Sequence, residues 1–165
     1  MRWTVSFFIA VTGVAVAFAT TGCPGDDPSS CTDYSPPASF DANAPAVSFA
    51  RDVVPVFTKS CGFSSCHGST TGSANGVFLG GTDPARIHAA IVDVRSSELP
   101  TMSFVKANEP RESFLLRKMD GSQCALTSQC TNGDCGQSMP RNEEPLPLAT
   151  RDTVRRWIAQ GAKND

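Results

Sequence analysis

Hydrophobic and polar positions divide the chain into an apolar start, a polar stretch and a longer region of helical spacing. Trp3 to Ala19 is a predominantly apolar run that follows the basic residue Arg2, which is the pattern of an export signal. Residues 24–45 are rich in Pro, Ser, Asp and Ala and show little periodicity, which predicts a tether of mixed flexible and extended character. Folded structure is therefore expected to begin near Val47.

A first helix is predicted directly after Val47, because apolar residues recur there at helical spacing. They are Phe49, Val53, Val56 and Phe57. Either Ser48 or Asp52 can serve as the N-cap. Proline is comfortable only in the first turn of a helix, so Pro55 predicts either a start near Asp52 or a kink there. The Gly-, Ser- and Thr-rich residues 68–81 are expected to form a loop around a short apolar segment.

Start and stop signals predict three more helices. Asp83 is expected to cap a short helix with Pro84 at its first position, and residues 108–110 resemble a second start of that kind. Thr150 is predicted to cap a final helix that Gly161 ends. The apolar face of this helix consists of Val154, Trp157 and Ile158, with Trp157 expected to be a core anchor. The elements predicted from these signals are short helices joined by loops.

Composition narrows the class of protein. A chain of 165 residues with 40% hydrophobic content suits one small domain behind a processed leader. All 16 Asp and Glu and 13 of the 14 Lys and Arg lie after residue 23, so the exported part has a net charge of about −3. No basic cluster exceeds the pair Arg155 and Arg156, which argues against nucleic acid as a partner. With two histidines and no catalytic triad or carboxylate pair, neither an enzyme nor a small-molecule substrate is expected.

The apolar start ends in Thr20-Thr21-Gly22-Cys23, which resembles the lipobox of bacterial lipoproteins. The resemblance implies cleavage before Cys23 and lipid on that residue. Plain secretion and an uncleaved N-terminal anchor are the alternatives. Each of them puts the domain outside the cytoplasm, in the periplasm or at the cell surface, where disulfides persist. The expected division is a signal peptide at 1–22, a tether at 23–46 and a folded domain at 47–165.

The segment from Cys61 to His67 carries the candidate chemistry. It reads CxxxxCH, two residues longer than the CxxCH signal for covalent haem attachment. Two thiols can add to the haem vinyl groups, and the histidine after the second thiol can bind the iron. Gly62, which can take positive φ, and the small Ser64 and Ser65 permit the bulge that the longer spacing needs. A disulfide between Cys61 and Cys66, or a zinc site that includes His67, remains open.

All seven cysteines can be assigned a role in two ways. Lipid on Cys23 and haem on Cys61 and Cys66 leave four cysteines for two disulfides. These are Cys31, Cys124, Cys130 and Cys135. Lipid on Cys23 and three disulfides without haem account for all seven cysteines equally well. The alternative to a haem protein is therefore a disulfide-stapled lipoprotein that serves as a binding or scaffold module.

Several short motifs follow one another along the chain: Phe49-Ala50-Arg51-Asp52-Val53-Val54-Pro55-Val56-Phe57, Cys61 to His67, Gly76-Val77-Phe78-Leu79, Asn108-Glu109-Pro110-Arg111-Glu112-Ser113-Phe114-Leu115-Leu116, Met139-Pro140 and Trp157-Ile158-Ala159-Gln160-Gly161-Ala162. Taken in this order, they resemble small class I c-type cytochrome domains, in particular planctomycete-type and myxobacterial lipoprotein cytochromes. The likeness covers roughly residues 47 to 163. The longer CxxxxCH and the cysteine-rich insertion before Met139 depart from the family pattern.

The resemblance implies an all-α domain around one covalent haem c. Cys61 and Cys66 match the thioether positions, His67 the proximal iron ligand and Met139 the distal ligand. Met102, Met119 and His88 are the other candidates for the distal position, and an open or water-bound site is the remaining alternative. With both axial positions filled, the protein is expected to carry single electrons between redox protein partners while lipid on Cys23 holds it to a membrane.

Overall fold

Helices and loops make up the part of the chain that this computed structural model describes, residues 31 and 33–165. The α-helices are α1 (Val54–Ser60), α2 (Pro84–Ile91), α3 (Phe114–Met119) and α4 (Leu148–Ala159). A π-helical turn (Phe49–Val53) precedes α1, and 3-10 turns lie at Ala74–Gly76, Pro110–Glu112, Gln123–Gln129 and Thr131–Gly133. Among the described residues only isolated β-bridges occur, without strands. The predicted helix-rich, loop-rich fold is confirmed at this level. The predicted export signal and the predicted lipidation residue Cys23 lie outside the described residues.

The first helix starts where its sequence predicts and changes pitch at its proline. The Ser48 hydroxyl accepts a hydrogen bond from the Arg51 amide at 3.4 Å, which makes Ser48 the N-cap. The π-helical turn ends at Val53, and Pro55 then occupies the first turn of α1, where its missing N–H costs nothing. The α-helix thus begins close to Asp52, which is one of the two alternatives for Pro55. The Asp165 carboxylate accepts from the Phe49 amide at 2.9 Å, so the C-terminus also caps this helix.

Caps decide the other helix starts. The Asp83 carboxylate accepts from the Ala85 amide at 3.0 Å, which confirms the predicted start of α2. At the predicted start at 108–110, a 3-10 turn spans Pro110–Glu112, and the α-helix α3 begins only at Phe114. The prediction that Thr150 caps the final helix is wrong. The Pro147 carbonyl already accepts from the Thr150 amide at 2.9 Å, so α4 begins at Leu148 and Thr150 lies in its first turn.

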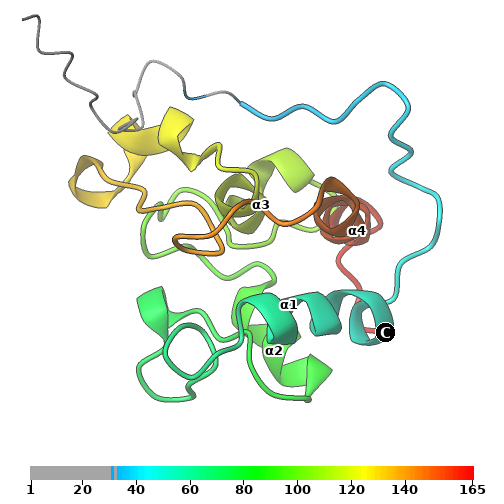
Figure 1. Cartoon of the computed structure of the whole chain (residues 1–165), viewed down its shortest axis with the longest axis horizontal. Coiled ribbons are helices and arrows are strands. Elements are labelled where there is room, and N and C mark those ends of the chain that lie inside the picture. The colour runs from blue at the N-terminus through cyan, green and yellow to red at the C-terminus, as the bar shows by residue number, and fades with distance from the viewer. Residues whose placement is uncertain (1–30, 32) are drawn as a thin grey trace, which may run out of the picture.

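An aromatic cluster joins the two ends of the domain. The indole of Trp157, which is 1% exposed, stacks on Phe49 with ring centroids 4.7 Å apart and meets Phe57 edge-on at 6.4 Å. Burying rings of this size is the largest apolar contribution available to such a small core. As Figure 1 shows, α1 and α2 lie on one side of the domain, and α3 and α4 on the other. Trp157 is therefore the core anchor that the sequence predicts.

Two disulfides stabilise the loops. Cys31 is joined to Cys124 across 93 residues, and Cys130 to Cys135 across five. All four predicted disulfide cysteines are therefore paired, and the bridge from Cys31 ties the N-terminal segment to the domain.

The described end of the predicted tether, residues 33–46, runs along α4 and is called the strap below (Figure 1). The Asp33 carboxylate binds the guanidinium groups of Arg111, at 2.9 Å, and Arg117. The Tyr34 ring lies 4.5 Å from the Arg155 guanidinium. Arg156 donates to the Asp41 carbonyl at 2.9 Å, and its guanidinium packs over Phe40. Arginines of the folded domain thus hold the strap at several points.

Candidate functional site

The CxxxxCH segment forms a closed loop at the end of α1. The Cys61 amide donates to the Phe57 carbonyl at 2.8 Å, as the last bond of the helix. The chain then turns back, so that the His67 amide donates to the Cys61 carbonyl at 3.2 Å. The Gly68 amide donates to the Phe63 carbonyl at 2.8 Å. These bonds bring the first cysteine and the histidine together despite the two extra residues.

Close approach of three glycines holds this loop against residues 77–80. The Leu79 amide donates to the His67 carbonyl at 2.7 Å. A Cβ on Gly68 would lie 2.1 Å from the Gly62 carbonyl oxygen, and one on Gly80 would lie 2.5 Å from the Gly68 Cα. The expectation that Gly62 supplies positive φ is wrong, because its φ lies outside the left-handed region. Gly62 is needed instead for space, since the backbone of Leu79 packs directly against it.

The two thiols of the loop are free and differ in accessibility. Cys61 is half-buried and Cys66 is exposed, and neither forms a disulfide. Burial raises the pKa of the Cys61 thiol to about 11, and the nearby Cys66 adds to this rise. The Phe63 ring is exposed on the same loop. The disulfide between Cys61 and Cys66 that the sequence left open is not formed in this structure.

His67 is oriented by a backbone carbonyl. Its Nδ1 lies 3.3 Å from the Val77 carbonyl oxygen, which can only accept, so Nδ1 carries the proton in this contact. The lone pair of Nε2 is then available to a metal. Burial lowers the pKa of the imidazole, which favours the neutral form that a metal requires. Val77 is thus the orienting partner of His67, a role that no feature of its side chain could indicate in the sequence.

Met139 lies at the end of α3, in the turn with Pro140. Its amide donates to the Lys118 carbonyl at 2.8 Å, and the side chain is partly buried. The backbone of Lys118 therefore holds the Met139 turn against the end of α3. No described hydrogen bond joins Met139 to His67.

The other candidates for the distal position lie in structural surroundings. Met119 is 3% exposed within the core, and the Met102 amide donates to the Leu99 carbonyl at 2.9 Å in a loop. His88 donates from Nε2 to the Ala162 carbonyl at 2.7 Å and packs edge-on against Trp157. Across residues 31 and 33–165, no three His, Cys, Asp or Glu side chains converge in a way that could hold a metal ion.

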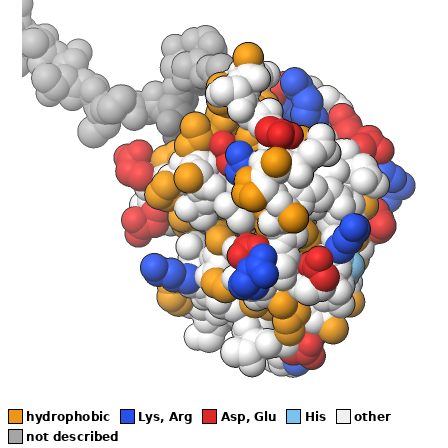
Figure 2. Space-filling model, turned by 90° about the vertical axis from the view of Figure 1, so that its right-hand side faces the viewer, with side chains coloured by type: hydrophobic (Ala, Val, Ile, Leu, Met, Phe, Trp, Pro, Cys, Tyr) orange, Lys and Arg blue, Asp and Glu red, His pale blue; other side chains and the backbone are white. Residues whose placement is uncertain are grey.

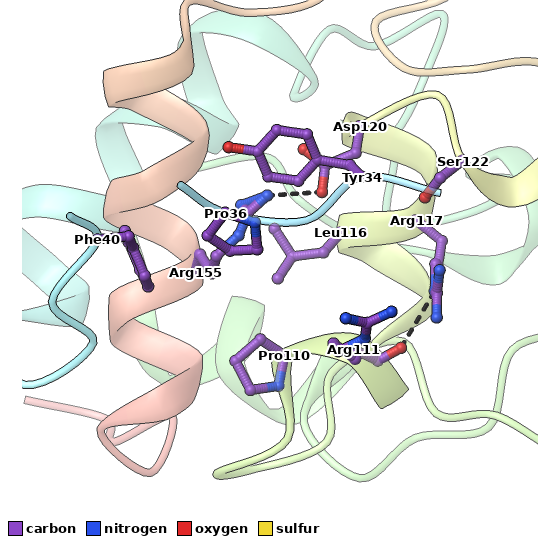
Figure 3. A pocket seen from close by; sticks show the side chains of 10 residues that line it. All are labelled: Tyr34, Pro36, Phe40, Pro110, Arg111, Leu116, Arg117, Asp120, Ser122 and Arg155. Carbon is purple, nitrogen blue, oxygen red and sulfur yellow. Dashed lines mark hydrogen bonds and ion pairs between the residues drawn. The ribbon is translucent and has the colours of Figure 1, made fainter. Parts of the chain in front are cut away.

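Two hollows lie elsewhere on the domain. Figure 3 shows the first, about 160 Å³, beneath the strap, with Tyr34 and Phe40 from the strap and Arg111 and Arg117 from the domain. The second, about 410 Å³, is polar and lies beside Arg95. Neither is lined by the cysteines of CxxxxCH, by His67 or by Met139. The candidate chemistry is therefore separate from both.

The surface carries no strong single-sign field on the face that Figure 2 shows, where acidic and basic side chains are interspersed among apolar ones. A net charge of −2 for the whole chain agrees with this mixture. Within the described residues, none of the helices has the length and apolar character needed to cross a membrane. Comparison with protein-family models, curated proteins and solved structures finds no match to the chain.

Proposed function

We propose that the chain is an exported, lipid-anchored monohaem c-type cytochrome that carries single electrons. The observation that supports this most directly is the state of the cysteines. Four of the six described cysteines pair with one another, while Cys61 and Cys66 stay free on the loop that ends in His67. Two free thiols next to a histidine, among described cysteines that otherwise pair, are available to attach a cofactor.

The donor set fits covalent haem. Cys61 and Cys66 would supply the two thioether sulfurs, and His67 would bind iron through Nε2 while its Nδ1–H stays on the Val77 carbonyl. Met139, in its turn beside Lys118, would be the second side chain offered to the iron. The iron of bound haem supplies a one-electron couple, and a thioether opposite an imidazole raises its potential.

This chain's own contribution is to hold and orient the ligands. The glycine contacts of Gly62, Gly68 and Gly80 fix the backbone of the CxxxxCH loop. The carbonyl of Val77 keeps the His67 imidazole in one tautomer. The core aromatic cluster and the disulfides make the surrounding scaffold rigid, which suits electron transfer because little reorganisation is then needed on a change of charge.

The test is maturation of the full chain in a host with a haem-ligation system, followed by the pyridine haemochrome assay. One covalent haem per chain is expected. The Cys61→Ser/Cys66→Ser double variant is expected to lose covalent haem, and His67→Ala to lose the native low-spin spectrum. Ser64→Ala, at an exposed position of the same loop, is the matched control and is expected to mature normally. An intact low-spin spectrum in His67→Ala would refute the ligand assignment.

The alternative, a haem-free scaffold lipoprotein, draws support from the two disulfides that staple the N-terminal segment at Cys31 and the loop after α3. It predicts a third disulfide, between Cys61 and Cys66, in the isolated protein. An intact mass with three disulfides and no porphyrin would favour this function over electron transfer.

A further inference from the structure

A buried ion pair connects the two halves of the proposed site. Lys118 on α3 is 6% exposed, and its Nζ lies 3.3 Å from Oε2 of Glu98. The other carboxylate oxygen of Glu98 accepts from the Asn75 amide group at 2.9 Å. Asn75 follows Ala74, whose backbone amide donates to the Cys66 carbonyl at 3.0 Å. Glu98 is thus tied to the CxxxxCH loop through a single intervening segment.

The same lysine holds the segment that carries Met139. Its Nζ donates to the Cys135 carbonyl at 2.6 Å, and its own carbonyl accepts from the Met139 amide at 2.8 Å. A Cβ on Gly136 would lie 2.7 Å from the Glu98 carboxylate and 2.9 Å from Lys118 Nζ, so the backbone packs directly onto the pair. Glu98 and Lys118 therefore bridge the loop of His67 and the turn of Met139.

Burying a lysine side chain is energetically unfavourable. Desolvation of an ammonium costs several kcal/mol, and replacing a buried ion pair with apolar side chains of similar volume is often neutral or stabilising. The other buried residues of α3 include Phe114, Leu115 and Met119, which are all apolar. What an apolar side chain could not do is hold the Cys135 carbonyl and the Glu98 carboxylate at once.

We propose that Glu98 and Lys118 are positioning residues that fix the Met139–Pro140 turn relative to the Cys61–His67 loop, and so determine which side chain reaches the distal side of the site. The statement about the distal ligand rests on the proposed function. The statement about the turn does not, because every contact that supports it exists in the chain without haem.

The experiment uses the full chain with Lys118→Leu, Glu98→Gln and the double variant. Asp152→Asn, at a partner of Arg155 on α4, is the matched control because it also alters a buried ion pair. In the haem-free chain, native-state hydrogen exchange of the Met139 amide is measured relative to global unfolding. Lys118→Leu is expected to accelerate it about tenfold, and Asp152→Asn to leave it unchanged. Exchange in the double variant is expected to match that in Lys118→Leu, since the two residues act together.

In the haem-loaded chain, the readouts are the reduction potential and the charge-transfer band of methionine–iron ligation. Lys118→Leu is expected to lose the band and lower the potential while keeping covalent haem. Unchanged Met139 exchange in Lys118→Leu would overturn the positioning role, and a retained band would overturn its effect on the ligand. Glu98→Gln, which keeps the side-chain volume, gives the same decision if Lys118→Leu does not fold. Absence of haem in the wild type would refute the proposed function alone, because the exchange measurement is independent of haem.

Discussion

Replacing Gly68 by alanine is predicted to disrupt the CxxxxCH loop. The added Cβ would lie 2.1 Å from the Gly62 carbonyl oxygen and 2.8 Å from the Phe63 carbonyl carbon. Ordinary contact begins at 3.4 Å, so the two backbone segments would have to separate by more than 1 Å. Both neighbours are backbone atoms that hydrogen bonds hold within the same loop, and neither can rotate away. The clash must therefore be relieved by opening the loop.

The magnitude follows from this geometry. Overpacking costs about 1–3 kcal/mol where side chains can adjust, and a backbone clash belongs at or above the upper end of that range. The lost chain entropy of glycine would return only about 0.4–1 kcal/mol. We therefore expect the free energy of unfolding of the haem-free Gly68→Ala chain to fall by about 2–3 kcal/mol in urea denaturation. Covalent haem loading is expected to fall with it, because Cys61 and His67 are brought together by this loop.

Ser64→Ala is the control for this substitution, since Ser64 is exposed on the same loop and its change is expected to stay within about 0.5 kcal/mol. If Gly68→Ala unfolds within about 0.5 kcal/mol of the wild type and loads haem normally, the reasoning from the glycine contacts is refuted.

Three more predictions concern the haem-free chain. Burial raises the Cys61 pKa from the ordinary 9.0 to about 11, so at pH 8 its thiolate fraction is about 100-fold below that of an unperturbed cysteine. Iodoacetamide should therefore label the exposed Cys66 before Cys61, which peptide mass spectra can follow. Equal labelling rates would contradict this. Because burial lowers the folded-state pKa of His67 below 6.5, the unfolded chain binds a proton more readily, so stability is present above pH 6.5 and is lost as pH falls below it. Urea midpoints should show a smaller loss in His67→Gln between pH 7.5 and 5.5, and identical losses would refute the assignment. The double variant Cys31→Ser/Cys124→Ser opens a loop of 93 residues and should lower the free energy of unfolding by about 2–5 kcal/mol. If calorimetry shows no loss of unfolding free energy, tying down the N-terminal segment adds nothing to stability.

Local signals in the sequence predict local structure well. Asp83 before Pro84 caps α2 as expected, because a cap depends only on the residues that follow it. Thr150 shows the limit of such signals. Pro147 fixes the chain direction three residues earlier, and two plausible starts within one turn cannot be ranked by sequence alone.

Contacts between distant segments could not be predicted. Glu98 and Lys118 are twenty positions apart, in a loop and on a helix, and neither residue type signals a buried pair. The parity of the cysteines left two or three disulfides open, and the choice of Cys124 as the partner of Cys31 depends on the folded arrangement.

The strap packs against the domain, although its amino-acid composition predicts a tether. A Pro- and Ser-rich segment is typical of a tether, yet the two aromatic residues of the strap pack against arginines of the domain. Tyr34 packs against Arg155, and Phe40 against Arg156. Single aromatic residues of this kind do not recur at a regular spacing, so hydrophobic periodicity does not reveal them.

The intact mass of the chain after maturation with a haem-ligation system tests the central claim most directly. The proposal predicts one covalent haem on Cys61 and Cys66, with Cys31–Cys124 and Cys130–Cys135 as disulfides. A mass without porphyrin, in which Cys61 and Cys66 form a third disulfide, would contradict it.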